Sequence, residues 1–365
     1  MNILPSPLLL LGVGGAGAAM LRGVLRAYGP GIRALAIDTD AQAGGNGDIP
    51  FLLLGGNRLA GRGTGGQPAS ARAAFQDTPT ILDTSLDGVR TVVIVTALGG
   101  GTGSGATGAI LKHLHTLGIA TLVFATLPFA FEGAERVRIA RTAIGPIEQH
   151  ADVSVFLPLD ELVSTAGTDN MRAALAHGID TLALGVTLLW RVLERPGYIR
   201  LDAERLRTIL TGCGRAHFAT ATAQGPDRAD AVLAALSESS FLKHDETSAH
   251  VRTLLVGILA GDDLRLSEVG TVASGLSAAF GLGATLELGT VNDEETFSGR
   301  LTVVTLVFDE SAIVTRKPAP GTTRATPRER ALARTDRFRH SDATMWNDED
   351  LDIPTFVRRH LTLDR

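Results

Sequence analysis

The chain has 365 residues, which is enough for two domains. It carries 34 basic and 39 acidic residues, and this formal net charge of −5 excludes a globally basic nucleic-acid-binding protein. Its single cysteine, Cys213, excludes a disulfide scaffold and a metal site built from cysteines. No apolar run approaches the roughly 18 residues of a membrane span, so we expect a soluble, cytoplasmic protein.

Short apolar runs alternate with helical stretches through the first half of the chain. The runs expected to form strands cover residues 8–13, 34–37, 91–97, 120–126 and 153–157. They are continuously apolar, which is typical of parallel strands covered by helices on both faces. We therefore predict an α/β fold, with a Rossmann-like parallel sheet in a nucleotide-binding domain over residues 1–170.

One long helix is predicted over Met171–Glu194, and Arg195-Pro196-Gly197 ends it. This central helix, residues 171–197, joins the first domain to a second. Beyond it the pattern changes to helices and β-rich runs, which predicts a smaller α+β domain over residues 198–310. Its helices are expected at 228–236 and 267–280, and its strands at 253–259, 284–288 and 301–308.

The composition changes after residue 310. Residues 316–340 hold eight Arg or Lys against two acids, with three prolines, so residues 311–345 are predicted to be a disordered basic linker. It either acts as a solvated spacer or touches anionic lipid or nucleic acid. Apolar residues return in residues 346–365, flanked by acids and then by arginines, which is typical of a short docking peptide.

The first of two glycine-rich loops, Gly12–Gly17, follows an expected strand and opens a helix. Its G-x-G-x-x-G pattern brings the backbone close to phosphate at a helix N-terminus. Asp38 ends the next strand, where a dinucleotide fold would hold a ribose. Taken alone, this loop fits either a tight turn or the NAD site of a Rossmann oxidoreductase.

The second glycine loop, Gly99–Gly105, has five glycines in seven residues and also stands between a strand and a helix. Each glycine costs conformational entropy on folding, so such a density predicts a nest of backbone N–H groups around a polyanion. Thr102 and Ser104 add hydroxyl groups. Because no G-x-x-x-x-G-K-[ST] is present, this is not a Walker P-loop. Two such loops at the carboxyl ends of strands predict a nucleotide with several phosphates.

The heptapeptide Gly-Gly-Gly-Thr-Gly-Ser-Gly of the second loop resembles the signature of the tubulin/FtsZ family. The resemblance covers about residues 7–310 and 347–359. It implies the tubulin/FtsZ fold, with a GTP-binding domain, and a GTPase that polymerises head-to-tail into filaments and organises the bacterial cell-division ring. The other matching segments are Ala36–Gln42, Gly61–Pro68, Pro128–Arg136, Ala260–Leu266 and Asp350–Arg359.

The resemblance also assigns the nucleotide contacts. Glu132 would bind the ribose hydroxyls and Arg136 would lie near the nucleotide, with Mg²⁺ accompanying it. Asp180 would read guanine, because a carboxylate accepts from both N1–H and the 2-amino group; from position alone it is equally a solvated helix acid. The residues implied to hold the phosphates of GTP or GDP are Gly14, Gly15, Gly100, Gly101, Thr102 and Gly103.

Several positions depart from the family pattern. Asp38 replaces the usual Asn. Around the base, Ala19, Leu175 and Ile179 stand where the family has Asn, Phe and Asn. These three changes remove stacking and hydrogen-bonding groups, so guanine specificity would rest largely on the remaining carboxylate.

The family's hydrolytic acids lie in a loop after the central helix and act on the nucleotide of the next subunit. Here Arg200, Asp202 and Arg205 fall on those positions, and Glu204 is adjacent. We expect Asp202 and Glu204 to be the catalytic residues of a slow GTPase. The arginines could instead pair with phosphate across the interface, or the loop could pack a contact without catalysis. The chain would then be a non-hydrolysing or slowly hydrolysing GTP-dependent scaffold.

The expected partners are further copies of the chain and a membrane-anchoring adaptor. The C-terminal peptide resembles the family's tail, which binds FtsA-like or other membrane-anchoring division proteins, so the protein is expected in the cytoplasm at the division site. Nucleic acid is not an expected partner. No metal site built by the chain itself is expected. The tail residues expected to enter the partner's groove are Leu351, Ile353, Pro354, Phe356 and Val357.

Overall fold

Two compact units make up the chain, residues 1–316 and 317–365. In the second unit, β11 (Met345–Trp346) pairs antiparallel with β12 (Glu349–Asp350). Almost all of the predicted linker lies outside the described residues, as do the tail residues Leu351, Ile353, Pro354, Phe356 and Val357. The computed structural model describes residues 8–28, 31–45, 47–164, 170–194, 197–201, 203–211, 214–239, 251–280, 284–309, 345–346 and 349–350.

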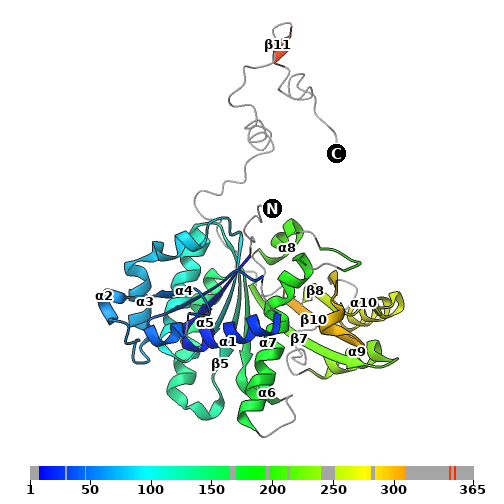
Figure 1. Ribbon diagram of the computed structural model, residues 1–365, viewed down its shortest axis with the longest axis horizontal. Coiled ribbons are helices and arrows are strands. Elements are labelled where there is room, and N and C mark those ends of the chain that lie inside the picture. The colour runs from blue at the N-terminus through cyan, green and yellow to red at the C-terminus, as the bar shows by residue number, and fades with distance from the viewer. Residues whose placement is uncertain are drawn as a thin grey trace. The chain divides into compact units, whose positions relative to one another are not determined.

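Six parallel strands form the first part of the sheet, in the order β3-β2-β1-β4-β5-β6 (Figure 1). Five of them lie where the apolar runs predicted strands, within one residue at either end. The sixth, β3, has only three residues and gave no such run. The bounds are β1 (Leu8–Val13), β2 (Ala34–Asp38), β3 (Phe51–Leu53), β4 (Thr91–Ala97), β5 (Ala120–Leu127) and β6 (Val153–Pro158).

Each face of these strands has its own hydrophobic core, because successive residues of a strand point to opposite sides. Leu10 and Val93 belong to the core beneath α1 (Gly14–Tyr28). Leu11 and Val92 belong to the core on the other face. This arrangement confirms the predicted α/β fold with a parallel sheet covered on both sides. The helices of the second face are α3 (Pro68–Asp77), α4 (Gly101–Thr116) and α5 (Ala134–His150).

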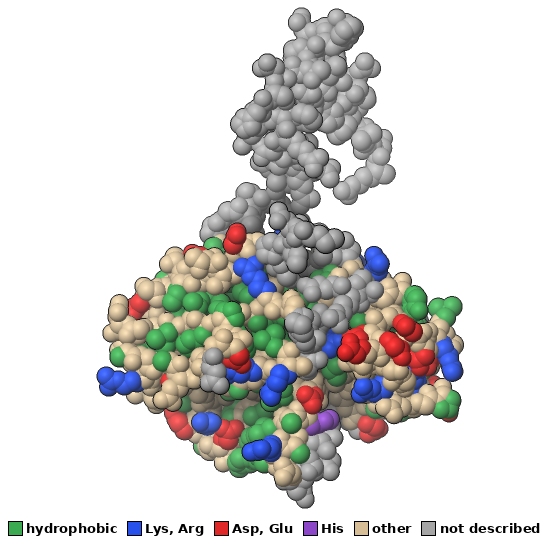
Figure 2. Space-filling model, in the orientation of Figure 1, with side chains coloured by type: hydrophobic (Ala, Val, Ile, Leu, Met, Phe, Trp, Pro, Cys, Tyr) green, Lys and Arg blue, Asp and Glu red, His purple; other side chains and the backbone are tan. Residues whose placement is uncertain are grey.

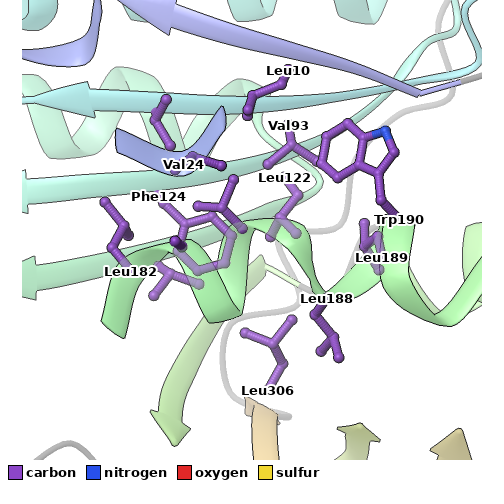
Figure 3. Close-up of a cluster of buried hydrophobic side chains, with 14 of the residues drawn as sticks. Leu10, Val24, Val93, Leu122, Phe124, Leu182, Leu188, Leu189, Trp190 and Leu306 are labelled. Atoms are coloured by element: carbon purple, nitrogen blue, oxygen red, sulfur yellow. The ribbon is translucent and has the colours of Figure 1, made fainter. Parts of the chain in front are cut away.

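The long helix α7 (Met171–Glu194) has the predicted bounds. Figure 3 shows Leu182 and Trp190 of α7 in the same cluster as Leu10 of β1 and Leu306 of β10 (Arg300–Asp309). Among the described helices, only the Met171–Leu193 stretch of α7 has the length and apolar content of a membrane span, although polar and charged residues interrupt its apolar sequence. More than half of its most apolar 18-residue segment is buried inside the protein, as in the core helix of a globular domain.

Four strands form the second part of the sheet, in the order β7-β10-β8-β9, with a core of their own under α9 and α10. Val153 and Ser154 of β6 pair with the start of β7, so the described strands of this unit form one sheet of ten. The bounds are β7 (Gly214–Gln224), β8 (Val251–Ala260), β9 (Thr285–Asn292), β10 (Arg300–Asp309), α9 (Arg228–Glu238) and α10 (Leu266–Phe280).

Several elements escaped the sequence analysis. The longest are α5, which contains Pro146, and β7, whose Ala- and Thr-rich sequence carries little apolar signal. The division of the chain at residues 170, 197 and 310 stays a prediction. The short helices are η1 (Ala41–Gly44), α2 (Gly56–Leu59), η2 (Pro79–Ser85), η3 (Ala130–Glu132), α6 (Leu159–Ser164), α8 (Ala203–Leu210) and α11 (Glu294–Phe297).

Charged side chains are unevenly spread over the face of the first unit seen in Figure 2. Several acidic side chains gather where the second part of the sheet and its helices lie, on the right of the view. Basic and acidic side chains are interspersed with apolar ones over the first part. The acidic area would repel a polyanion, in line with the net negative charge of the whole chain.

Candidate nucleotide-binding site

The two glycine loops touch each other at the carboxyl ends of β1 and β4. Gly14 begins α1 directly after β1 and has a φ of +82°, which favours glycine. A Cβ on Gly14 would lie 3.1 Å from the backbone nitrogen of Gly103. The unpaired N–H groups at the starts of α1 and α4 therefore lie next to each other, as a phosphate site requires.

Hydroxyl groups fix the second glycine loop. The Ser104 Oγ accepts a hydrogen bond from Gly99 N at 2.9 Å, so this hydroxyl serves the loop itself. The Thr96 Oγ1 donates to the carbonyl of Val13 at 3.1 Å, which ties the end of β4 to the end of β1. The loop is thereby held in place before any ligand arrives, and binding costs less conformational entropy.

Not all glycines of the second loop face open space. A Cβ on Gly101 would lie 1.9 Å from Thr64 Oγ1, and one on Gly103 would lie 2.3 Å from the carbonyl oxygen of Ala97. A Cβ on Gly100 would meet no atom within 4 Å. Gly101 and Gly103 are therefore needed for packing against neighbouring segments, and Gly100 is the glycine whose side opens outward.

Thr102 is buried, and its Oγ1 lies 2.8 Å from the Oγ1 of Thr39, where either can donate. Thr39 follows β2, and its carbonyl accepts from Gly63 N at 3.0 Å. The ends of β2 and β4 and the Gly61–Pro68 segment are thus joined around one pair of hydroxyls. The sequence analysis missed Thr39, although it lies in the segment Ala36–Gln42 that carried the family resemblance.

Glu132 and Arg136 form an ion pair beside the second glycine loop. The Glu132 Oε1 accepts from Phe129 N at 2.9 Å, and its Oε2 contacts the Arg136 guanidinium. A Cβ on Gly99 would lie 3.2 Å from the carbonyl oxygen of Arg136. The pair is therefore placed near the loop, and the carboxylate keeps lone pairs that could accept from ribose hydroxyls.

The residues predicted around the base lie on α1 and α7. A Cβ on Gly23 would lie 2.3 Å from Ile179 Cγ2, so the two helices pack in direct contact there. Ala19 and Leu175, each one turn away along its own helix, are exposed. The residues predicted to face the base at these two positions are therefore aliphatic and exposed.

Asp180 is exposed and lines a cavity of about 990 Å³ between α7 and the strands β7 and β10. His177 and Phe218 line the same cavity. Within the described residues, Asp180 makes no hydrogen bond or ion pair with either glycine loop. The predicted reading of guanine by this carboxylate stays a prediction.

The predicted catalytic residues are only partly described. Asp202 lies outside the described residues, and Glu204 belongs to α8 with a side chain outside the description. Arg205 is ion-paired with Glu287 of β9 in the same chain. Arg200 is exposed and forms no ion pair with the described residues. The sequence analysis missed the Arg205–Glu287 pair, since nothing in the two segments signals it.

Comparisons with known proteins identify the class to which this fold and site belong. Residues 7–167 match the model of the tubulin/FtsZ family GTPase domain. The structure resembles an FtsZ dimer from M. jannaschii, with a TM-score of 0.76 and 24% identity, covering 82% of this chain and 87% of that one. It also resembles a GTPγS-bound CetZ2 protofilament from Haloferax volcanii, with a TM-score of 0.67 and 23% identity, covering 82% and 92%.

Two curated relatives indicate which branch of this family the chain resembles. The chain is 34% identical over 298 residues to the cell division protein FtsZ of Pseudomonas putida, covering 80% of this chain and 74% of that protein. It is 33% identical over 289 residues to FtsZ of Pseudomonas aeruginosa, covering 78% and 73%. The chain therefore belongs to the tubulin/FtsZ family, as an FtsZ-like member that carries the family's GTPase domain.

Proposed function

We propose that the chain binds GTP and GDP at the two glycine loops, polymerises head-to-tail into filaments and organises the bacterial cell-division ring. The observation that carries this proposal is the contact between Gly14 and Gly103, which puts the N-termini of α1 and α4 at one point. Two helix N-termini and their glycine amides supply the unpaired donors that a polyphosphate needs. The FtsZ relatives are named as cell division proteins, which supports the cellular role.

The nucleotide is proposed to run from the glycine loops to the exposed residues Ala19 of α1 and Leu175 of α7. Gly14, Gly15 and Gly100–Gly103 would face the phosphates, and Glu132 the ribose. The base would lie on Ala19 and Leu175, next to Asp180. With small or aliphatic groups in place of stacking and amide groups, guanine specificity rests on the Asp180 carboxylate.

Hydrolysis is proposed to be completed in trans by the loop around Asp202, with Glu204 as a second acid. The Arg205–Glu287 ion pair supports this choice over a phosphate role for Arg205, because its guanidinium is already engaged in its own chain. The second candidate function is a GTP-dependent scaffold with little turnover. This second candidate is favoured by Arg200 and Arg205, which replace two of the residues that the family has in this loop.

The Asp202→Ala variant should release phosphate at least about tenfold more slowly than wild type, because an acid that orients the attacking water is lost. Phosphate release during assembly is the measurement, with light scattering to show that filaments still form. Asp230→Ala, a change of an exposed acid on α9, is the matched control and should match wild type. Equal or brisk release from both variants would refute the role of Asp202. Glu204→Ala in the Asp202→Ala background then tests the second acid.

The remaining partners follow from the family resemblance. Mg²⁺ is proposed to accompany the nucleotide. The tail residues Leu351, Ile353, Pro354, Phe356 and Val357 are proposed to bind an FtsA-like or other membrane-anchoring division protein, which would hold the filaments at the division site. Self-association is supported by the dimer and protofilament forms of the structural neighbours.

The central test is nucleotide-triggered assembly of the full chain. GTP should raise light scattering strongly, whereas GDP should bind without assembly and ATP and NAD should do neither.

In the Asp180→Ala variant, GTP affinity should fall by about tenfold or more, because both hydrogen bonds to guanine disappear. A chain lacking residues 346–365 should assemble like wild type but fail to reach adaptor-bearing vesicles.

Two outcomes would contradict the proposal. A chain that retains no guanine nucleotide and forms no fibres with GTP is not a GTP-dependent polymer. Retention of NAD without assembly would instead favour the oxidoreductase that the first glycine loop and Asp38 left open.

A further inference from the structure

Asp38 is a buried carboxylate at the end of β2, beside the proposed phosphate site. Its residue is 4% exposed. The Oδ1 accepts from Thr39 N at 2.6 Å and lies 3.4 Å from both Asp40 N and Thr39 Oγ1. These bonds hold the side chain in one orientation, so the position of its second oxygen is fixed.

The second oxygen, Oδ2, faces the first glycine loop. A Cβ on Gly15 would lie 3.4 Å from it. Within the described residues, Oδ2 has no hydrogen bond and no ion pair. A fixed negative charge without a cation therefore stands next to the second residue of α1, where the proposed function places phosphate.

A carboxylate repels a phosphate bound beside it, and the repulsion is strong where burial lowers the effective dielectric constant. A neutral side chain of the same shape, such as Asn, would not. The charge of Asp38 must be compensated when a nucleotide enters. The described residues contain no group of three or more His, Cys, Asp or Glu that would hold a metal ion by itself, so the phosphates have to share the ligation.

Hard divalent cations take oxygen ligands of this kind, and Mg²⁺ is commonly held by one or two carboxylates together with substrate phosphates. We propose that Asp38 makes nucleotide binding depend on a divalent cation, which Asp38 Oδ2 and the phosphates hold together. This inference rests on the proposed function, in which the two glycine loops bind a guanine nucleotide. It assigns Asp38 to cation-linked phosphate binding, distinct from the ribose role of a dinucleotide fold.

The test is calorimetric binding of GDP and of guanosine to the full chain, in MgCl₂ and in EDTA. GDP should bind wild type at least about tenfold more weakly in EDTA, whereas guanosine, which has no phosphate, should bind equally in both. The Asp38→Asn variant keeps the Oδ1 bonds and should bind GDP within about twofold under the two conditions. Asp48→Asn, a carboxylate of an exposed ion pair with Arg22, is the matched control and should keep the wild-type dependence.

The outcomes separate the alternatives. Equal GDP binding by wild type in MgCl₂ and EDTA, or a retained dependence in Asp38→Asn, would overturn the inference and leave the proposed function standing. Weaker binding of guanosine by Asp38→Asn would assign the carboxylate to the ribose and would also overturn it. No GDP binding by wild type under any condition would overturn the proposed function and this inference with it. Thermal unfolding without nucleotide checks that Asp38→Asn is folded.

Discussion

The Gly103→Ala variant should lose nucleotide-triggered assembly. Its new Cβ would lie 2.3 Å from the carbonyl oxygen of Ala97 and 2.8 Å from Thr96 Oγ1. Neither neighbour can move away easily, because the Ala97 oxygen belongs to the backbone and Thr96 Oγ1 is hydrogen-bonded to the carbonyl of Val13. The second glycine loop must therefore shift away from β4 and from Gly14. We expect nucleotide affinity to fall at least about tenfold and unfolding free energy by about 1–3 kcal/mol.

Gly270→Ala provides the control, since it makes the same chemical change at an exposed helical position of α10. A Cβ on Gly270 would meet no atom within 4 Å. This variant should bind GDP like wild type and be more stable by about 0.5–1 kcal/mol, because alanine loses less backbone entropy than glycine in a helix. Urea unfolding and GDP titration of both variants give the comparison. If Gly103→Ala bound GDP as tightly as Gly270→Ala did, the second loop would not be the phosphate site.

The sequence predicts the glycine loops well but cannot distinguish between two uses of glycine. A ligand and a neighbouring backbone both require a missing side chain. Gly100 faces open space, whereas Gly101 and Gly103 are needed because Thr64 and Ala97 approach them. These neighbours come from other segments, so their positions depend on how the strands and helices pack together.

The fold likewise has elements that a local sequence pattern predicts and elements that depend on distant segments. The parallel strands were predictable because burial on both faces requires continuous apolar runs, as in Thr91–Ala97. The strand β7 was not, since its alanines and threonines are as compatible with a helix as with a strand. Its pairing with β10, for example Ala221 with Val303, makes it a strand. The hydroxyl contact between Thr39 and Thr102 likewise needs the order of strands β2-β1-β4, which no local pattern contains.

A buried ion network in the second part of the sheet yields the other large effect that we expect. Arg228 is 3% exposed and binds both carboxylate oxygens of Glu268, at 2.7 Å and 3.0 Å. Its Nη1 also donates to Asp263 at 2.7 Å. The Arg228→Ala variant should lose about 3–5 kcal/mol of unfolding free energy, because Glu268 would stay buried without its partner. Urea unfolding measures this loss.

The pH dependence of unfolding distinguishes this network from simple packing. The hydrogen bond from Arg228 is the main cause that lowers the pKa of Glu268 below its ordinary value of 4.5. A lowered pKa in the folded state means that the unfolded state binds more protons, so stability rises with pH in this range. The stabilisation by Glu268 is therefore present above about pH 4.5 and is lost as the pH falls through the lowered pKa. Glu268→Gln should flatten that part of the curve.

Two further variants show whether the loss of unfolding free energy comes from the buried charges of Arg228 and Glu268 or from the volume of their side chains. Arg58→Ala breaks an exposed ion pair with Asp77 and should leave unfolding unchanged, because solvent screens that pair. Arg228→Met combined with Glu268→Leu removes both buried charges together and should cost much less than Arg228→Ala, since no buried charge is left unpaired and the Asp263 carboxylate, whose side chain is 49% exposed, is solvated by water. If the double variant were as unstable as Arg228→Ala, the loss would come from packing between α9 and α10, and the account of a buried, mutually dependent ion pair would be wrong.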